Sequence, residues 1–578
     1  MHLPAVTLED WRRLVDKELA GKDFDRALVY RPTEGVAIAP LYTEAPPPDP
    51  AARYARPSPF RICMRHEAGA SQADLVADAA EGADALWVPL EVALSGALAS
   101  EALADTSFVV EAPGVPSAET FERIAAGRAT GASPALVLGV DPIASRAEGR
   151  ADFASLASDL ASLGRLALGA WERRAAATTV VVSGLPYHDA GADAADELAI
   201  ALSTGARYLE ALLGAGLSPV SARAAIALRV AVGRDSFVEL CKLRALRVCW
   251  EKMLVACGAS VLSGTGRTLV HAVCSTPALS VRDPWVNMLR VTTQVFSAVT
   301  GGADLVTPRA FDQAFGAPSP LGRRVARNTG LVLREESMLG KVSDPAGGSY
   351  YFDTLTDTLA REAWERFRAL EREGGVVAAL ESGRLAARLE GAWRRRLERI
   401  ATRRHPVLGV SDFANLDEAL PHAAPDDEAP ALAEGGLPGR RDAAPFERLR
   451  LRADAIAPRP EALLVPLGSP AESRPRVGFA AGLLAAGGVR AREGHAEERA
   501  VVACLCGSDE QYAAEAAERA RSLKAAGALR VLVAGRPGAL EAPLREAGVD
   551  GFVYVGCDAL AELEEILATL VRASEEPS

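Results

Sequence analysis

The segment TTVVVSGLPYHDAGADAADELAIALSTGARYLEALLGAG, residues 178–216, contains a strand signal followed at once by a helix signal. The run TTVVVS (178–183) is short, apolar and β-branched, which is typical of a strand buried on both faces of a parallel sheet. The segment ADELAIALSTGARYLEALLGAG then spaces its apolar residues at helical intervals. A strand followed by a helix is one βα unit, so this stretch predicts an α/β fold.

Strand signals of the same kind recur along the first half of the chain and alternate with helical patterns. There are eight of them: residues 60–64, 85–90, 107–112, 135–140, 178–183, 225–232, 268–274 and 304–308. Eight alternating units over about 250 residues predict a (β/α)₈ TIM barrel, which we assign to residues 51–355. An open doubly wound sheet is the alternative, because the order of strands along the chain does not prove closure.

The segments around the barrel differ from it in composition. Residues 1–50 contain one short amphipathic helix and extended chain, too little for a core of their own, so we predict an arm for subunit contact that ends in the stiff spacer APPPDP (45–50). Residues 356–405 predict charged helices packed on the barrel, and the Pro-, Ala- and acid-rich residues 406–458 predict a linker. In residues 459–578, the runs EALLVPLG, VVACLCG, LRVLVAG and GFVYVG alternate with helices and predict a flavodoxin-like, doubly wound domain.

Bulk composition excludes several classes of protein. The 578 residues carry a net charge of −12, which argues against a nucleic-acid binder because phosphate contacts need clustered Lys and Arg. The beginning of the chain lacks the apolar core of a secretory signal, and no uncharged apolar run approaches the ~18 residues of a membrane span, so we expect a cytoplasmic protein. Cys504 and Cys506 share one strand face, but no second ligand pair follows them; we therefore expect buried small residues rather than a metal site.

Five long segments resemble the methylmalonyl-CoA mutase family, in order and nearly from end to end. They are KELAGKDFDRALVYRPTEGVAIAPLYT, SGLPYHDAGADAADELAIAL, VELCKLRALRVCWEKM, VARNTGLVLREES and VSDPAGGSYYFDTLTDTLAREAW. Catalytic chains of that family join a barrel that threads an acyl-CoA to a flavodoxin-like cobalamin domain. The resemblance thus implies the two-domain architecture that the periodicity predicts.

The chain departs from the family at the barrel mouth. Catalytic chains have S-G-Y-H-M, in which the tyrosine contacts substrate and the histidine hydrogen-bonds the thioester carbonyl. Here Leu185 and Pro186 occupy those two positions; proline has no side-chain donor and no backbone N–H. His188 lies two residues further on, and we expect a polar loop residue rather than a catalytic one. The family's R-T-H-x-Q-T-S-G is also reduced, to HAVCSTPALS, in which His271 lies within a strand and is expected to be a hydrogen-bonded core or rim residue.

The second domain departs from the family as well. Cobalamin domains of the family carry D-x-H-x-x-G after the first strand, and the histidine is the lower ligand of cobalt. Alignment on Gly468 places Pro470, Glu472 and Pro475 at the Asp, His and Gly positions. The resemblance therefore implies a degenerate cobalamin-binding domain, and we expect no cofactor, catalytic or metal residue on this chain.

The resemblance implies a non-catalytic small subunit of a heterodimer. Its partner, the large subunit, would carry adenosylcobalamin and interconvert methylmalonyl-CoA and succinyl-CoA, and this chain would stabilise it. One alternative is an active acyl-CoA mutase that uses cobalamin bound in trans; an open axial channel would favour it over a barrel filled with aliphatic side chains. Another is an unrelated barrel enzyme, with candidate residues near the carboxyl ends of strands: Glu111, Asp141, His188, Arg234 and Asp304.

Overall fold

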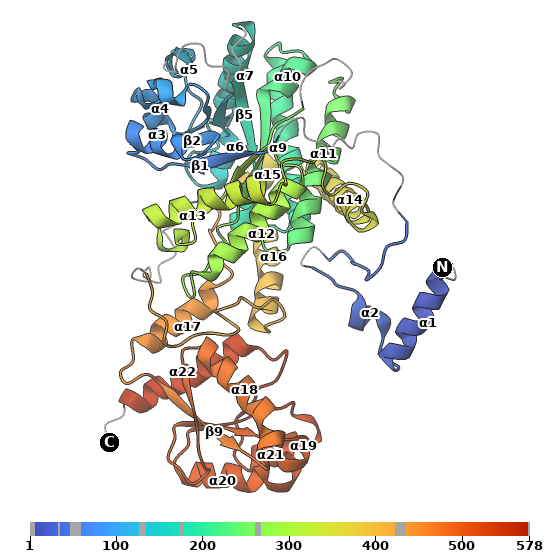
Figure 1. The fold of residues 1–578 in the computed structure, drawn as a ribbon, viewed down its shortest axis with the longest axis vertical. Helices are drawn as coiled ribbons and strands as arrows, with labels where there is room; N and C mark the ends of the chain where they lie inside the picture. Colours follow the sequence, from blue (N-terminus) through green and yellow to red (C-terminus); the bar gives the residue numbers. More distant parts are fainter. Residues whose placement is uncertain are drawn as a thin grey trace.

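The molecule contains two α/β units joined by a helical region (Figure 1). The computed structural model describes residues 6–32, 35–44, 46, 59–126, 135–173, 177–259, 267–421 and 435–575. The first unit holds an eight-stranded barrel and the second holds a five-stranded sheet, and all strand pairs of both are parallel. This is the predicted order of domains.

The barrel is closed by pairing between its first and last strands. Arg61 pairs with Leu305 and Ile62 with Val306, and each remaining strand pairs with its neighbours in sequence. Closure confirms the predicted (β/α)₈ barrel and shows that the open sheet is wrong. The strands are β1 (Arg61–Arg65), β2 (Ala85–Pro89), β3 (Ser107–Ala112), β4 (Leu136–Val140), β5 (Ala177–Ser183), β6 (Ile226–Val232), β7 (Val270–Cys274) and β8 (Leu305–Thr307).

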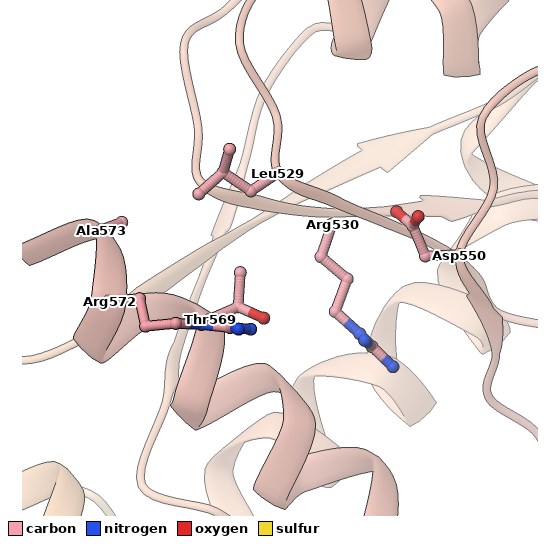
Figure 2. Close-up of a pocket in the computed structure, with 6 residues that line it drawn as sticks. All are labelled: Leu529, Arg530, Asp550, Thr569, Arg572 and Ala573. Carbon is pink, nitrogen blue, oxygen red and sulfur yellow. The ribbon is translucent and has the colours of Figure 1, made fainter.

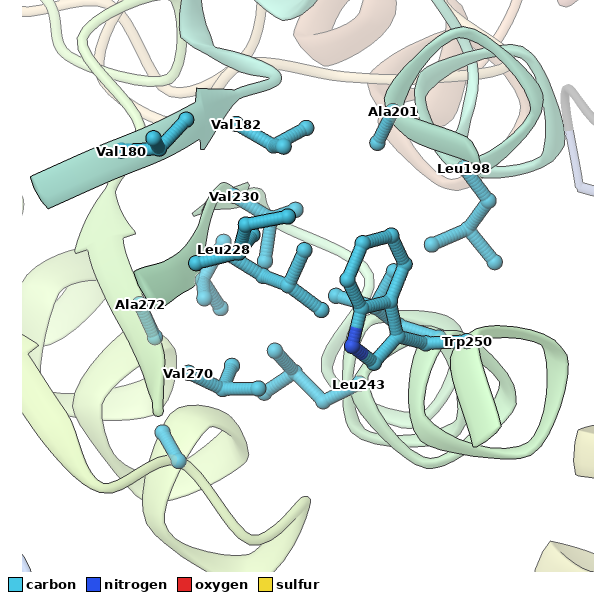
Figure 3. Close-up of a cluster of buried hydrophobic side chains, with 14 of the residues drawn as sticks. Val180, Val182, Leu198, Ala201, Leu228, Val230, Leu243, Trp250, Val270 and Ala272 are labelled. Atoms are coloured by element: carbon cyan, nitrogen blue, oxygen red, sulfur yellow. The ribbon is translucent and has the colours of Figure 1, made fainter. Parts of the chain in front are cut away.

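Each barrel strand buries both of its faces, which explains the continuous apolar runs. In β5, Val180 and Val182 face the surrounding helices, whereas Val181 faces the barrel interior with residues of the other strands. Figure 3 shows the outer layer, in which side chains of β5, β6 and β7 pack against Leu198 of α9 and Trp250 of α11.

Helices surround the barrel on its outer side (Figure 1). After β8, α14 packs against α9 and α11, and it crosses the predicted boundary at residues 355 and 356, so the post-barrel helices are continuous with the barrel unit. The helices are α3 (Gln72–Ala80), α4 (Leu90–Leu94), α5 (Ala118–Ala126), α6 (Pro142–Ala147), α7 (Leu156–Glu172), α8 (Leu185–Asp189), α9 (Ala194–Gly214), α10 (Pro219–Ala225), α11 (Ser236–Ala256), α12 (Val286–Thr300), α13 (Pro320–Leu331), α14 (Tyr350–Arg372), α15 (Gly375–Glu381) and α16 (Arg384–Ala401).

The second unit is a doubly wound sheet in the order β10-β9-β11-β12-β13, which is the flavodoxin-like order. Helices α18 and α22 cover one face of the sheet, and α20 and α21 cover the other. The polar edge strand β10 adds a fifth strand to the four predicted. The elements are β9 (Glu461–Pro466), α18 (Pro470–Ala486), β10 (Arg490–Glu493), β11 (Val502–Cys506), α19 (Asp509–Gln511), α20 (Ala517–Ala525), β12 (Arg530–Val533), α21 (Glu541–Glu546), β13 (Gly551–Phe552) and α22 (Ala559–Glu575).

The arm contains two helices, α1 (Leu8–Leu19) and α2 (Phe24–Leu28), which lie apart from the barrel in Figure 1. They pack on each other through the rings of Trp11 and Phe24, whose centroids are 6.3 Å apart. Neither helix buries a residue. The predicted spacer at residues 45–50 lies, except for Pro46, outside the described residues.

The predicted linker, 406–458, contains a helix that the composition did not reveal, α17 (Ala444–Asp454). Helix α17 packs on α22 of the second unit, and Glu447 Oε1 accepts a hydrogen bond of 2.6 Å from the backbone N–H of Val281, in the loop after β7. Arg282 also forms an ion pair with Asp454. This part of the segment therefore ties the two units together, whereas residues 422–434 lie outside the described residues.

Close packing between α9 and α11 makes a testable prediction. A Cβ added at Gly205 would overlap the Trp250 ring. We expect Gly205→Ala to lower the free energy of unfolding by about 1–3 kcal/mol through overpacking, measured by urea denaturation. The control is Gly214→Ala at the end of the same helix, where nothing lies within 4 Å of the added Cβ; it should leave stability unchanged or higher. Equal effects of the two substitutions would contradict the packing described here.

Candidate functional site: the barrel mouth and the second-domain crevice

The interior of the barrel is occupied by side chains from its own strands. One alternate set of strand residues points inward and forms a buried cluster that includes Trp87, whose side chain is 2% exposed. The other members of the cluster are Cys63, Ala85, Val109, Val137, Val181, Ala227, Val273 and Leu305. Filling by layers of side chains is the usual content of a TIM barrel. The largest side chain of this cluster is an indole, which the aliphatic pattern of the strands did not lead us to expect.

Polar residues surround Trp87 inside the barrel. The guanidinium carbon of Arg229, on β6, lies 4.0 Å from the centre of the indole, and that of Arg65, on β1, lies 4.8 Å from it. The ring of His271, on β7, meets the indole edge-on at 5.4 Å. Sequence reasoning missed Trp87 and Arg229; the signal was one charged residue within the apolar run AIALRVAV.

His271 is a hydrogen-bonded core residue, as predicted. Its Nε2 lies 2.8 Å from the Thr307 hydroxyl, and its Nδ1 accepts a hydrogen bond of 3.4 Å from Arg229 Nε. Burial and the neighbouring guanidinium of Arg229 hold the pKa of His271 well below its usual range. The imidazole is therefore neutral at physiological pH.

The loop after β5 becomes the first turn of a short helix, α8. Leu185 begins α8 and packs against the interior cluster from the carboxyl end of β5. Pro186 is buried at the start of α8, where its missing N–H breaks no helical hydrogen bond. A Cβ at Gly184 would lie 2.6 Å from Glu197 Oε1, so glycine allows the loop to approach that carboxylate.

His188 joins a buried ionic network at the mouth. Its Nε2 lies 2.7 Å from Ser275 Oγ, and its Nδ1 lies 3.6 Å from Glu197 Oε2. Glu197 in turn forms an ion pair of 2.8 Å with Lys242, which is fully buried and also contacts Glu239 at 2.5 Å. The network links α8, α9, α11 and the loop after β7, and every charge in it has a partner. His188 thus holds loops together at the barrel mouth.

The four remaining barrel candidates do not converge on one point. Asp141 accepts hydrogen bonds from Tyr208 Oη at 2.5 Å and from the N–H groups that begin α6 and end β5. Glu111 lies 3.7 Å from Arg65, and Arg234 forms an ion pair with Asp442. Asp304 precedes β8 and accepts from the N–H of Val270, so it lies at the amino end of the barrel; its prediction as a carboxyl-end residue is wrong.

A backbone segment, residues 435–443, crosses the loops at the carboxyl end of the barrel. Its N–H groups at Leu437, Arg440 and Asp442 donate to the carbonyls that end α6 and α8 and to that of Pro277 in the loop after β7, at 2.7, 2.9 and 3.0 Å. Asp442 is buried and accepts from Arg234 at 2.9 Å and from Arg396 at 2.7 Å. These arginines overcome the effect of burial and hold the pKa of Asp442 at about 2, so this contact is ionic at neutral pH.

In the second unit, the residues that the sequence analysis aligned with a cobalamin motif lie in the first turns of helix α18. Pro470 occupies the first turn, and Ser469 and Glu472 form a reciprocal capping box in which Glu472 Oε2 accepts from the N–H of Ser469 at 2.7 Å. Pro475 lies inside the same helix. The loop that would carry an imidazole is therefore a capped helix start.

The strand order of this sheet reverses between β9 and β11, and side chains bridge the crevice at the carboxyl ends of these strands. Arg476 donates to the carbonyl oxygen of Ala534 beyond β12 and lies 3.0 Å from Asp509. Gln511 Nε2 lies 3.4 Å from Glu472 Oε1, across the carboxyl ends of β9 and β11. Ligands of doubly wound sheets bind at such a reversal; here these contacts connect its two sides.

Other parts of the second unit offer no ligand set. Cys504 and Cys506 are buried in the sheet, as predicted, and His495 is exposed. No group of three His, Cys, Asp or Glu side chains able to hold a metal occurs among the described residues. Figure 2 shows a recess lined by Arg530 and Arg572, but Arg530 begins β12, at the end of the strand opposite to the crevice. Among all the residues that the structure describes, no helix is long and apolar enough to cross a membrane.

Comparison with known proteins agrees with this architecture. The family model described as methylmalonyl-CoA mutase matches residues 167–433. The methylmalonyl-CoA mutase small subunit of Streptomyces virginiae is 38% identical over 98% of this chain and 97% of its own length. The small subunit of Propionibacterium freudenreichii subsp. shermanii is 36% identical over 75% of this chain and 69% of its own, and the Escherichia coli methylmalonyl-CoA mutase is 30% identical over 48% and 38%.

These matches define the class of the protein: a mutase-type barrel followed by a flavodoxin-like domain. The chain belongs to the methylmalonyl-CoA mutase family. Within the family, it matches relatives named small subunit over nearly its whole length.

The buried pair of Glu197 and Lys242 predicts an unusual response to pH. Burial would raise the pKa of Glu197, but Lys242 and His188 hold it at about 2, below the ordinary 4.5. The lowered pKa means that its contribution to stability is present above pH 4.5 and is lost as pH falls towards 2. Lys242→Met would remove the ammonium that both buried glutamates share and leave Glu197 with only His188 and the backbone N–H of Ala231. We expect this to lower the free energy of unfolding at pH 7 by about 3–5 kcal/mol.

The sign of the change distinguishes this network from ordinary packing. Without the ammonium, burial raises the pKa of Glu197, so the variant should gain stability as pH falls from 7 to 5, a range over which the stability of the parent does not change through this pair. Urea denaturation at both pH values measures this difference. Lys252→Met, at an exposed position of the same helix, serves as control and should change stability by less than about 0.5 kcal/mol. A Lys242→Met variant with the parent's pH dependence would contradict the network.

Proposed function

We propose that this chain is the non-catalytic small subunit of a heterodimeric methylmalonyl-CoA mutase. The partner, a large subunit, would carry adenosylcobalamin and interconvert methylmalonyl-CoA and succinyl-CoA, and this chain would stabilise it. The observation that carries the proposal is the filled barrel: Trp87 belongs to the interior cluster, and Leu185, beyond the carboxyl end of β5, packs against that cluster. An acyl-CoA threaded through the barrel would need the space that these two side chains occupy.

The second domain supports the same proposal. Cobalt ligation in the family needs an imidazole from the loop after the first strand, and this loop has Pro470, Glu472 and Pro475 instead. Glu472 is engaged in its own helix cap, and Arg476 bridges the crevice. This residue set does not fit the lower face of cobalamin. The radical chemistry is therefore assigned to the partner.

The arm supports contact with another chain. Leu8 and Leu14 of α1 are 55% and 62% exposed, and no residue of that helix is buried in the chain itself. The extended segment after α2 does dock on the barrel unit, through buried Val36 and Ile38 and through a hydrogen bond of 2.8 Å from Tyr30 Oη to Asp235. The arm is thus anchored at one end, and at the other end it presents an amphipathic helix whose apolar side is exposed.

All eight cysteines are free thiols, which is the state expected of a protein in the reducing cytoplasm.

Turnover by separate and combined chains tests the proposal directly. We expect no cobalamin absorbance and no mutase turnover from this chain alone, and turnover when it is coexpressed with its large subunit. The large subunit alone should be less stable, because a partner that binds only the folded state stabilises it by mass action. Turnover or a bound corrinoid on the isolated chain would overturn the proposal and favour the active-mutase alternative.

The arm gives a second prediction. Deletion of residues 1–45 should weaken copurification with the large subunit by at least about tenfold in affinity, a loss of about 1.4 kcal/mol. Leu8→Asp should weaken it as well, and it keeps the helix because an acidic residue is favourable in the first turn.

The matched control for the arm is Arg13→Ser. Arg13 is exposed on the opposite side of α1 from Leu8, so this variant should copurify like the parent. Unchanged copurification of the deleted chain would remove the arm from the interface. It would leave the account of the barrel interior intact.

A further inference from the structure

Three buried nitrogen donors inside the barrel have no hydrogen-bond acceptor. They are Arg229 Nη2, Trp87 Nε1 and Arg65 Nε. Arg229 is 5% exposed and Trp87 is 2% exposed, so bulk water does not serve them. Both guanidinium groups lie against the same indole, at 4.0 and 4.8 Å from its centre. A buried donor without an acceptor costs about 1–3 kcal/mol, more when it is charged.

Arg229 also differs from the other buried arginines in its charge balance. Arg223 forms a bidentate pair with Glu251 at 2.7 and 2.9 Å, and Arg244 pairs with Asp344 at 2.6 Å. Within the described part of the chain, no carboxylate oxygen lies within 4 Å of Arg229. Its hydrogen bond to His271 reaches a neutral ring that supplies no charge. The carboxylates of Glu111 and Asp141 act on Arg229 only from beyond 4 Å. Burying a cation without a direct counter-charge is unfavourable, so this layer of the barrel favours an anion.

The neighbouring strand leaves room beside the unsatisfied nitrogen. Gly139 of β4 occupies an inward position, and a Cβ there would lie 3.5 Å from Arg229 Nη2 and 3.0 Å from the carbonyl oxygen of Val110. With glycine, no side chain occupies that place. The rim above it is partly open, because the side chains of Arg65 and Glu111 are 31% and 25% exposed. Solvent therefore reaches the rim of the layer that contains Arg229.

We propose that the barrel binds one small monovalent anion, of the size of chloride or formate, between Arg229 Nη2 and Trp87 Nε1. The size follows from the packing, because Trp87 and its aliphatic neighbours fill the interior further along the axis. The charge follows from the donors: a guanidinium and an indole N–H can only donate, and an anion can accept from both. The anion completes the polar layer of the barrel and replaces the carboxylate that the other buried arginines have. The proposal concerns this chain alone and does not depend on the partner.

Thermal unfolding of the full-length chain tests the proposal. Chloride or formate would replace gluconate at constant ionic strength and pH, so that only the size of the anion changes. We expect a saturable rise of the midpoint, about 5 °C at a hundredfold excess over the dissociation constant. No difference between chloride and gluconate would overturn the proposal and leave water as the acceptor. Displacement of the bound anion by an acyl-CoA would also overturn it, since the site would then accept a long ligand.

Two variants locate the site. Arg229→Met should abolish the response to chloride, and its stability in gluconate should equal or exceed that of the parent because an uncompensated charge is gone. Gly139→Ala keeps the charge and fills the space, so it should weaken the response at least tenfold in anion concentration; it remains informative where Arg229→Met fails to fold. Arg165→Met, at an exposed position of α7, is the matched control and should respond like the parent.

Bromide gives a direct structural readout. Crystals grown in bromide should show an anomalous peak within hydrogen-bond distance of Arg229 Nη2, and the peak should be absent in Arg229→Met. A chloride response of equal size in Arg229→Met and the parent would contradict the assignment, as would bromide only at the protein surface.

Discussion

A closed barrel of eight strands has an interior that something must fill, and this constraint governs the whole chain. The pairing of β1 with β8 makes the enclosed volume inaccessible from the sides. Either a ligand or side chains then occupy the axis, because buried voids are costly. Here inward residues of all eight strands meet around Trp87, with Arg229 and His271 against its ring. The barrel therefore keeps its fold through its own side chains.

In the second unit, too, the chain's own side chains take the place of a ligand. A ligand loop after β9 would leave the first N–H groups of α18 without acceptors. The Ser469–Glu472 box satisfies them locally, and Pro470 removes one donor altogether. Across the crevice, Arg476 reaches the carbonyl oxygen of Ala534. The groups that would face a cofactor bind one another, so on the proposed role the sheet needs no ligand for its stability.

Sequence reasoning succeeded where local pattern determines the structure. The apolar runs predicted the barrel strands to within two residues at their ends, because both faces of a parallel strand are buried. It failed where pairing or long-range contacts decide. Closure depends on register between β1 and β8, and α17 is stabilised by α22 and by the loop after β7 although its segment has a linker-like composition. The polar strand β10 forms only because β9 offers it an edge.

The same distinction between local pattern and long-range contacts explains which residues of the candidate site could be predicted. The absence of an imidazole at Glu472 follows from the sequence alone, because no folding can supply a missing side chain. The partners of His188 could not be found this way, since Ser275 lies 87 residues away and Glu197 belongs to the next helix. Trp87 and Arg229 come from strands four apart in the barrel, so only the closed ring brings them together. A residue lost from a motif can thus be recognised from the sequence, whereas a residue that takes over its volume is recognised only in the fold.

If the chain stabilises a partner by contact, there is a physical reason for domains that are stable without a ligand. A partner gains stability from a neighbour only to the extent that the neighbour is already folded, because mass action depends on the concentration of the folded form. The ion pair of Glu197 and Lys242 and the segment 435–443 hold the barrel loops without substrate or cofactor. The arm, in contrast, is not held by such internal contacts along its whole length: α1 leaves its apolar side exposed and has no packing partner among the described residues of its own barrel. On the proposed role, the contacts within the two domains stabilise the chain itself, and the exposed apolar side of the arm is left for the partner.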